Sequence, residues 1–208
     1  MTKYIIRSLF VALIVSTVMT MFRHGVLDRA VDMTPSFSSL HLPQFSKTVS
    51  AAVEGNPGSF HYCPNENLEP LDVEAINSAE GHLDIAMYSF TDHAIADAVV
   101  DAARRGLRVR IYRDREQYAE EQNRDPYVPQ ALASNQNISV RVKNGRELMH
   151  LKEWSDGVHL REGSANWSNS GERRQDNSVA FYDDRRAADA FERKFEEMWD
   201  RPGNTRVQ

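Results

Sequence analysis

The sequence predicts an α/β fold in which helices flank a mixed β-sheet. Residues 83–90 and 107–112 are short, mostly apolar runs, and the segment between them, 94–106, repeats its apolar side chains at helical spacing. This alternation indicates a β-α-β unit, whose crossover is expected to be right-handed. With 208 residues, of which 41% are hydrophobic, the chain can bury one core of ordinary size.

The elements can be followed from about residue 70 onward. Residues 71–79 place Leu, Val, Ile and Ala at loosely helical spacing, and the strand at 83–90 comes next. Either Thr91 or Asp92 can cap the following helix, which ends at Gly106. The apolar face of that helix consists of Ala94, Ile95, Ala98, Val99 and Ala102.

The second half of the chain is less regular. The polar stretch 114–137 gives no clear assignment, whereas 138–142 and 179–182 read as short strands. The chain then finishes with an amphipathic helix, whose apolar side consists of Ala187, Ala190, Phe191, Phe195 and Met198. Such a stripe predicts core packing rather than a binding surface.

The N-terminal residues differ in character from the rest. Lys3 and Arg7 precede an uncharged apolar run at 8–22, which favours a signal peptide or a signal anchor over a buried helix. No small-x-small cleavage site follows the run, so an uncleaved anchor is the preferred interpretation. We therefore expect a protein that is membrane-anchored or exported, for example to the periplasm. The expected divisions are a signal segment at 1–24, a Ser/Pro-rich linker at 25–59, a catalytic domain at 60–202 and a tail at 203–208.

Two short motifs carry reactive side chains. His150 and Lys152 lie two residues apart, and the segment 163–166, Gly-Ser-Ala-Asn, begins eleven residues after the lysine. Residues two apart on a strand face the same way, so a hairpin turning at 156–157 would gather these side chains over one patch of sheet. A neutral imidazole can attack phosphorus while Lys152, Ser164 and Asn166 bind the phosphoryl oxygens. The pattern predicts attack on a phosphodiester.

This chemistry requires no metal ion. Cys63 is the only cysteine, and no cluster of histidines and carboxylates has the spacing of zinc or magnesium ligands. We therefore expect neither a cofactor nor a metal site.

The two motifs resemble the signature of the phospholipase D superfamily, H-x-K-x4-D-x6-G-[ST]-x-N, and the resemblance extends over residues 60–200. It implies a phospholipase D-like mixed sheet with a single signature domain, in which His150 is the nucleophile. Asp156 and Gly163 take the structural positions of the signature. Gly171 to Asn177 looks like the stretch where family members carry an acid beside this histidine, and by that resemblance Asp176 orients His150.

The resemblance also implies a second subunit. Family enzymes use two histidines in each active site, one as nucleophile and one as general acid, and this chain carries one signature. Its single-signature relatives include bacterial nucleases and the mitochondrial cardiolipin hydrolase. We therefore expect a homodimer whose two copies of His150 share one site. If the source is eukaryotic, the mitochondrial outer membrane is the alternative location.

One departure from the signature leaves an alternative open. Only Glu153, Trp154 and Ser155 separate Lys152 from Asp156, where the family has four residues. Either a bulge or a shortened turn absorbs the change, or Asp156 leaves its usual position. A catalytically inactive binding or scaffold protein therefore remains an alternative to the enzyme.

The charge distribution bears on the substrate. Residues 1–59 hold five of the 25 Lys and Arg and three of the 30 Asp and Glu, which leaves 20 basic and 27 acidic residues beyond. This acidic balance, together with the anchor, favours a phospholipid substrate, for which Trp154 and Trp167 could form an apolar rim. The short, loop-poor domain and local arginines favour a nucleic acid, so the two substrates are nearly equal candidates. Arginines that could line a groove for it are Arg104, Arg105, Arg108, Arg110, Arg113, Arg115, Arg173 and Arg174.

Overall fold

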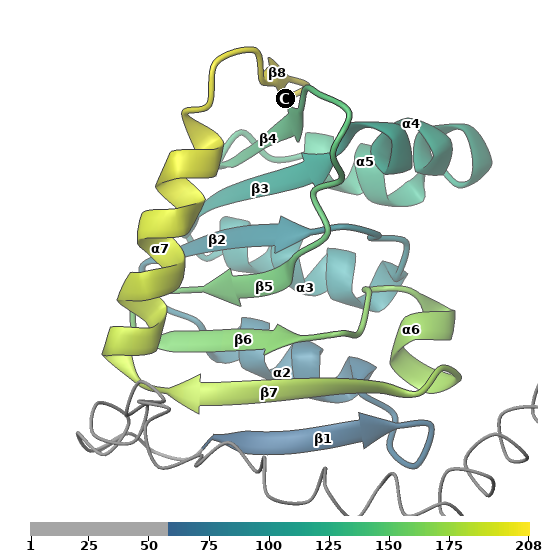
Figure 1. The fold of residues 1–208 in the computed structure, drawn as a ribbon, viewed down its shortest axis with the longest axis vertical. Helices are drawn as coiled ribbons and strands as arrows, with labels where there is room; N and C mark the ends of the chain where they lie inside the picture. Colours follow the sequence, from purple (N-terminus) through teal and green to yellow (C-terminus); the bar gives the residue numbers. More distant parts are fainter. Residues whose placement is uncertain (1–57) are drawn as a thin grey trace, which may run out of the picture. The chain divides into compact units, whose positions relative to one another are not determined.

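Eight strands form one mixed sheet in the order β1-β7-β6-β5-β2-β3-β4-β8 (Figure 1). The computed structural model describes residues 58–208. The strands are β1 (Ser59–Cys63), β2 (His82–Met87), β3 (Arg108–Asp114), β4 (Ile138–Lys143), β5 (Lys152–Ser155), β6 (His159–Gly163), β7 (Asn177–Asp183) and β8 (Thr205–Arg206). The helices are α2 (Glu69–Ser78), α3 (His93–Arg104), α4 (Arg115–Arg124), α5 (Tyr127–Ala133), α6 (Asn169–Arg173) and α7 (Arg185–Trp199). The predicted mixed sheet flanked by helices is confirmed.

The sheet changes from parallel to antiparallel at its centre. Strands β2, β3 and β4 run parallel, as the predicted β-α-β unit requires. Strand β5 lies antiparallel to β2, and β6, β7 and β1 continue the antiparallel half. Because β5 returns along β2, its first residue, Lys152, pairs with Met87 at the carboxyl end of β2. This end of β2 is where ligands commonly bind in α/β folds.

Helices cover both faces of the sheet. In Figure 1, α7 crosses the near face, whereas α2 and α3 lie behind the strands. The larger core fills the space on the α2 and α3 side and includes Ile85, Val99 and Trp154. A smaller core packs Phe191 and Phe195 of α7 on the opposite side of the sheet. Phe191, Phe195 and Met198 of the stripe predicted for the last helix are therefore core packing, as expected, whereas Ala190 is exposed and Ala188 is buried instead.

Two regions of the chain add structure that the sequence pattern did not assign. The polar stretch 114–137 forms α4 and α5, with the Asp114 side chain accepting from the N–H groups of Glu116 and Gln117 at the start of α4. Only Tyr118 and Glu121 of α4 are buried, which explains the weak apolar periodicity. At the C-terminus, β8 pairs with β4, although these residues belong to the expected tail.

The predicted signal or anchor segment and the linker lie outside the described residues, apart from the last residues of the linker. Within residues 58–208, no helix has the length and apolar character needed to cross a bilayer.

Strand β5 contains no bulge that could absorb the short spacing of the signature, and Asp156 begins the turn of the β5–β6 hairpin. Strand β5 pairs with β2 without a bulge from Lys152 to Ser155. The turn follows at once, and the Asp156 carboxylate accepts from the N–H groups of Val158 (3.0 Å) and His159 (2.8 Å). Gly157 occupies the left-handed region with φ of 90°. Of the three alternatives the bulge is therefore excluded, which leaves a shortened turn or an Asp156 that has left its usual position.

We expect Gly163→Ala to destabilise the fold, because β6 and β7 approach each other too closely there for a side chain. An added Cβ would overlap the carbonyl oxygen of Ser178 and lie 2.9 Å from Cα of Val179. Such overpacking costs about 1–3 kcal/mol, and urea denaturation should report this loss in the free energy of unfolding. A variant with unchanged stability would contradict the close approach of the two strands.

Candidate active site

The first half of the site lies where β5 meets the end of β2. His150 is exposed and immediately precedes β5, whereas Lys152 begins the strand and is 4% exposed. Both approach Tyr88, which follows β2. The ring centroids of Tyr88 and His150 are 4.7 Å apart, and the Lys152 ammonium lies 5.1 Å from the centre of the Tyr88 ring. Tyr88 is thus a shared neighbour of both reactive side chains.

Backbone hydrogen bonds fix the segment that carries His150. The Met149 N–H donates to the buried carboxylate of Asp114 at 3.0 Å, and the Tyr88 N–H donates to the carbonyl of Leu151 at 3.0 Å. The Lys152 ammonium donates to the carbonyl oxygen of His150 at 2.7 Å. These three contacts, on either side of the imidazole, position the histidine although its side chain is exposed.

The second half of the site follows β6. The Asn166 carboxamide oxygen accepts from the N–H of Ser89 at 3.3 Å, so it attaches to the residue next to Tyr88. The Ser164 hydroxyl donates to the side chain of Asn177 at 2.9 Å and accepts from the N–H of Ser178. The segment 88–89 therefore contacts both halves of the signature. His150 and Lys152 touch Tyr88, and Asn166 touches Ser89.

Asp176 stands apart from this arrangement. It is exposed in the turn that precedes β7, and within residues 58–208 no hydrogen bond joins it to His150. Its expected role as the acid that orients the imidazole stays a prediction.

The protonation of the two reactive side chains follows from their surroundings. Although His150 is exposed, partial desolvation of its ring, followed by the neighbouring charge of Lys152, lowers its pKa below the ordinary 6.5, while Asp114 opposes this shift. Burial, followed by the charge of Arg161, lowers the pKa of Lys152 to about 8. At neutral pH the imidazole is therefore mainly neutral and the ammonium mainly charged, which suits a nucleophile beside an anion-binding group.

Residues 73–199, more than half of the chain, match the family described as cardiolipin synthase, PLD-like domain. The chain belongs to the phospholipase D-like family.

Two relatives, both named mitochondrial cardiolipin hydrolase, come from Chlamydomonas reinhardtii and Xenopus tropicalis. The first is 26% identical over 129 residues, which is 62% of this chain, and the second is 26% identical over 122 residues, which is 58%. The match spans 56% of each relative's length.

Solved structures of this family share the fold. NucT from Helicobacter pylori superposes with a TM-score of 0.62 and 26% identity, over 69% of this chain and 95% of that one. Nuc from Salmonella typhimurium, described as a phospholipase D family member, also gives a TM-score of 0.62, with 24% identity over 73% and 97% of the two chains. These matches support the mixed sheet and its helices as a phospholipase D-like domain.

The phospholipase D-like site rests on buried charges that the sequence motifs did not reveal. Arg161 is fully buried and pairs with the Asp72 carboxylate through two hydrogen bonds, of 2.9 and 3.0 Å. Glu172 is also fully buried, lies 3.7 Å from Arg161 and has no hydrogen bond to either carboxylate oxygen within the described chain. Asp72 lies about 80 residues before the signature, so no local spacing in the sequence could have associated these residues.

The arginines that the sequence suggested for a nucleic-acid groove do not gather on one surface. Arg113 is buried against Glu121, and Arg110 binds Asp84 and Glu196 beneath α7. Arg104 pairs with Asp101 on α3. Arg105 donates to the carbonyl oxygen of Ile76, and Arg115 donates to the Asn144 side chain. Arg173 pairs with Glu69 of α2. The grouping of these six arginines in sequence reflects separate ion pairs and hydrogen bonds, whereas Arg108 and Arg174 are exposed and have no ion pair within residues 58–208.

The apolar rim suggested for a lipid substrate is also corrected. Trp154 and Trp167 are 1% and 0% exposed and belong to the core on the α2 and α3 side of the sheet. Trp154 follows the inward alternation of β5, and Trp167 packs edge to face on Phe90. Neither indole is available to a membrane.

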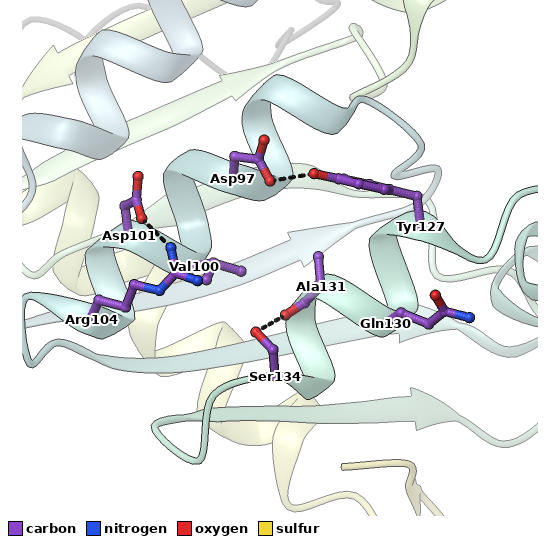
Figure 2. A pocket seen from close by; sticks show the side chains of 8 residues that line it. All are labelled: Asp97, Val100, Asp101, Arg104, Tyr127, Gln130, Ala131 and Ser134. Atoms are coloured by element: carbon purple, nitrogen blue, oxygen red, sulfur yellow. Dashed lines mark hydrogen bonds and ion pairs between the residues drawn. The ribbon is translucent and has the colours of Figure 1, made fainter.

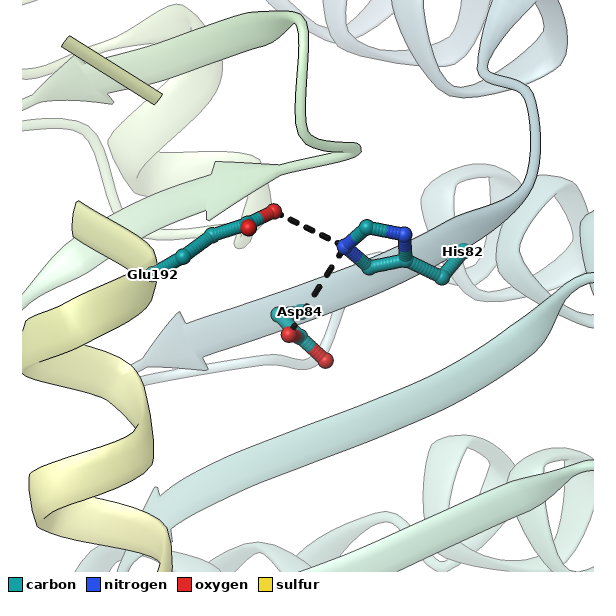
Figure 3. A group of neighbouring side chains, drawn as sticks. All are labelled: His82, Asp84 and Glu192. Carbon is teal, nitrogen blue, oxygen red and sulfur yellow. Dashed lines mark hydrogen bonds and ion pairs between the residues drawn. The ribbon is translucent and has the colours of Figure 1, made fainter. Parts of the chain in front are cut away.

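One group of potential metal ligands lies at the opposite end of β2. His82, Asp84 and Glu192 bring their ligand atoms within 4.8 Å of one another (Figure 3). Sequence spacing missed this group because Glu192 comes from α7. Both oxygens of Asp84 already bind Arg110, and His82 is hydrogen-bonded to Glu192 at 2.8 Å. The group is best explained as an ion-pair network that attaches α7 to the sheet.

A surface pocket of about 520 Å³ lies between α3 and α5 (Figure 2). Its polar side chains satisfy one another, since Tyr127 donates to Asp97 and Arg104 donates to Asp101. None of the signature residues lines this pocket. The candidate active site is instead the surface around Tyr88 that holds His150.

The buried Glu172 predicts how stability depends on pH. Burial, then the charge of Asp72, raise the pKa of Glu172 to about 8 against the opposing charge of Arg161. An unfolded glutamate titrates near 4.5, so between pH 4.5 and 8 the folded chain holds the extra proton and this group makes stability fall as pH rises. We expect Glu172→Gln to remove that decline, measured by urea denaturation across this range. Parallel stability curves for the two proteins would contradict the buried, protonated carboxyl.

Proposed function

We propose that this protein is a metal-independent phosphodiesterase that acts through a covalent phosphohistidine on His150. The observation that carries the proposal is the attachment of both halves of the signature to the segment 88–89. An exposed, mainly neutral imidazole and a charged Lys152 approach Tyr88, and the Asn166 carboxamide binds the neighbouring Ser89. These groups supply a nucleophile and two hydrogen-bond donors for the phosphoryl oxygens.

The proposed reaction has two steps. His150 of one subunit, in its neutral form, attacks phosphorus and displaces the leaving oxygen, which takes a proton from His150 of the second subunit, whose imidazole has first been protonated from solvent. That second imidazole, now neutral, then removes a proton from water, and the resulting hydroxide breaks the phosphorus–nitrogen bond. Lys152, Ser164 and Asn166 bind the phosphoryl group, and Asp176 is proposed to orient His150 once substrate is bound.

A phospholipid is the first candidate substrate. Leu148 is 54% exposed only two residues before His150, which gives the site an apolar neighbour in place of the buried tryptophans. The curated relatives are named for cardiolipin hydrolysis. A lipid substrate also agrees with the proposed N-terminal anchor at a membrane.

A nucleic acid is the second candidate, favoured by two other side chains. Arg146 and Arg174 are exposed, and neither has an ion-pair partner among residues 58–208. Arg146 lies four residues before His150, and Arg174 lies two residues before Asp176. Both could bind phosphates that flank the scissile bond.

We expect His150→Ala to abolish turnover on whichever substrate the wild-type protein prefers. Wild type and variant are assayed with excess chelator on cardiolipin vesicles, single-stranded DNA and bis(p-nitrophenyl) phosphate. Loss of the nucleophile should lower kcat by at least about 10³-fold. His159→Ala is the matched control, because His159 is exposed at the start of β6, at the other end of the hairpin. A folded wild-type protein that turns over none of the three would favour the scaffold alternative.

Mixing the same variant with wild type tests the shared site. If each site needs two copies of His150, equal amounts of exchanging subunits should leave about a quarter of the activity of the same total amount of wild type. Independent sites would leave about half. Light scattering of the purified protein establishes whether the chain is dimeric at the assay concentration.

A further inference from the structure

We propose that Arg161 is a positioning residue, whose buried guanidinium holds the two halves of the signature at a fixed separation. This inference rests on the proposed function, since it assigns a residue that aligns the groups of that same site. Arg161 contacts neither reactive side chain. It acts through the backbone of the two segments that carry them.

The first step of the argument is the place where the β5–β6 ladder ends. The two strands pair at Ser155 with Leu160 and at Trp154 with Arg161. Toward the site, the described chain has no further pair between them, although β6 remains paired with β7 as far as Gly163. The strands thus separate just before Lys152 and Ser164, so main-chain pairing alone does not fix the distance between the two motifs.

The Arg161 side chain replaces the missing pairs. Its Nη1 donates to the carbonyl oxygen of Lys152 at 2.7 Å, and its Nη2 donates to the carbonyl oxygen of Ala165 at 3.2 Å. Lys152 belongs to the first half of the signature, and Ala165 stands between Ser164 and Asn166 of the second. One rigid, planar group therefore binds both halves at once, which a lysine ammonium could not do with the same geometry.

A second set of contacts fixes the guanidinium itself. The Asp72 carboxylate of α2 accepts from Nε and Nη2 in a bidentate pair, and both side chains are fully buried. Without solvent around it, the arginine keeps the orientation that these hydrogen bonds set. Displacing reacting groups by about 1 Å can lower a rate by about 10²-fold, so this constraint bears directly on turnover.

The test replaces the buried pair by apolar side chains of similar size. Asp72→Leu combined with Arg161→Met removes both charges together, which avoids leaving one of them unpaired. The matched control is Asp84→Leu with Arg110→Met, which removes another bidentate pair, on the α7 face of the sheet. We expect the first double variant to lose kcat by about 10²-fold with KM nearly unchanged, and the control to keep wild-type kcat.

Two further measurements distinguish a displacement of the site residues from a general loss of folding stability. The alkaline limb of the pH profile should move to higher pH in the first double variant, because Arg161 helps to lower the pKa of Lys152. The second measurement follows the NMR signals of the His150 ring and the Asn166 side-chain amide while inorganic phosphate is added. Compared with wild type, these signals should be displaced in the first double variant and unchanged in the control. A general loss of stability moves neither.

Each outcome decides between the alternatives. Wild-type kcat and unmoved His150 and Asn166 signals in a folded Asp72→Leu, Arg161→Met protein would overturn the positioning role and leave the proposed function intact. If the wild-type protein shows no turnover while the signals still shift, the proposed function fails and the positioning role stands. If that double variant does not fold, Arg161→Lys takes its place, since it keeps the buried charge but cannot bridge both carbonyls. Wild-type kcat in Arg161→Lys would then overturn the proposal.

Discussion

The carboxyl end of β2 is the constraint on which the rest of the site depends. Strand β2 pairs with parallel β3 on one side and with antiparallel β5 on the other, so its last residues meet the start of β5. Beyond Met87 the backbone leaves the ladder, and its N–H groups need new acceptors. Tyr88 finds the carbonyl of Leu151, Ser89 finds the Asn166 side chain, and Thr91 and Asp92 find the carbonyl of Trp167. Completing the hydrogen bonds of β2 therefore assembles both halves of the signature.

Two fully buried arginines support this end of the sheet. Arg161 donates to the carbonyls of Lys152 and Ala165, and Arg113 donates to those of Met87 and Tyr88. Each also pairs with a buried carboxylate, Asp72 for Arg161 and Glu121 for Arg113. Removing one partner of such a pair commonly costs about 3–5 kcal/mol. Buried ion pairs are an expensive way to stabilise a core, which suggests that their value here lies in fixing the backbone around His150.

The sequence predicted the repetitive parts of this fold well and the long-range charges not at all. The β-α-β unit from β2 to β3, the hairpin and the last helix follow from local periodicity and turn residues, and all three are present. Helix α4 was missed because only Tyr118 and Glu121 are buried on it. In the site, the spacing of His150 with Lys152 and of Ser164 with Asn166 was informative because the signature is local. Arg161 gave no signal because its partner Asp72 comes from α2, and Glu172 gave none because charged residues are usually exposed.

Strand β5 stays regular although the spacing from Lys152 to Asp156 is one residue shorter than in the signature. A residue lost within a paired strand would reverse the faces of all the side chains beyond it. Here Lys152 and Trp154 pair with Met87 and Ile85, so β5 keeps its inward and outward alternation up to Ser155. The turn follows directly after Ser155, and there the Asp156 carboxylate binds the N–H groups of Val158 and His159. At the opposite end of the hairpin, Arg161 binds both backbone segments that carry the reactive pairs.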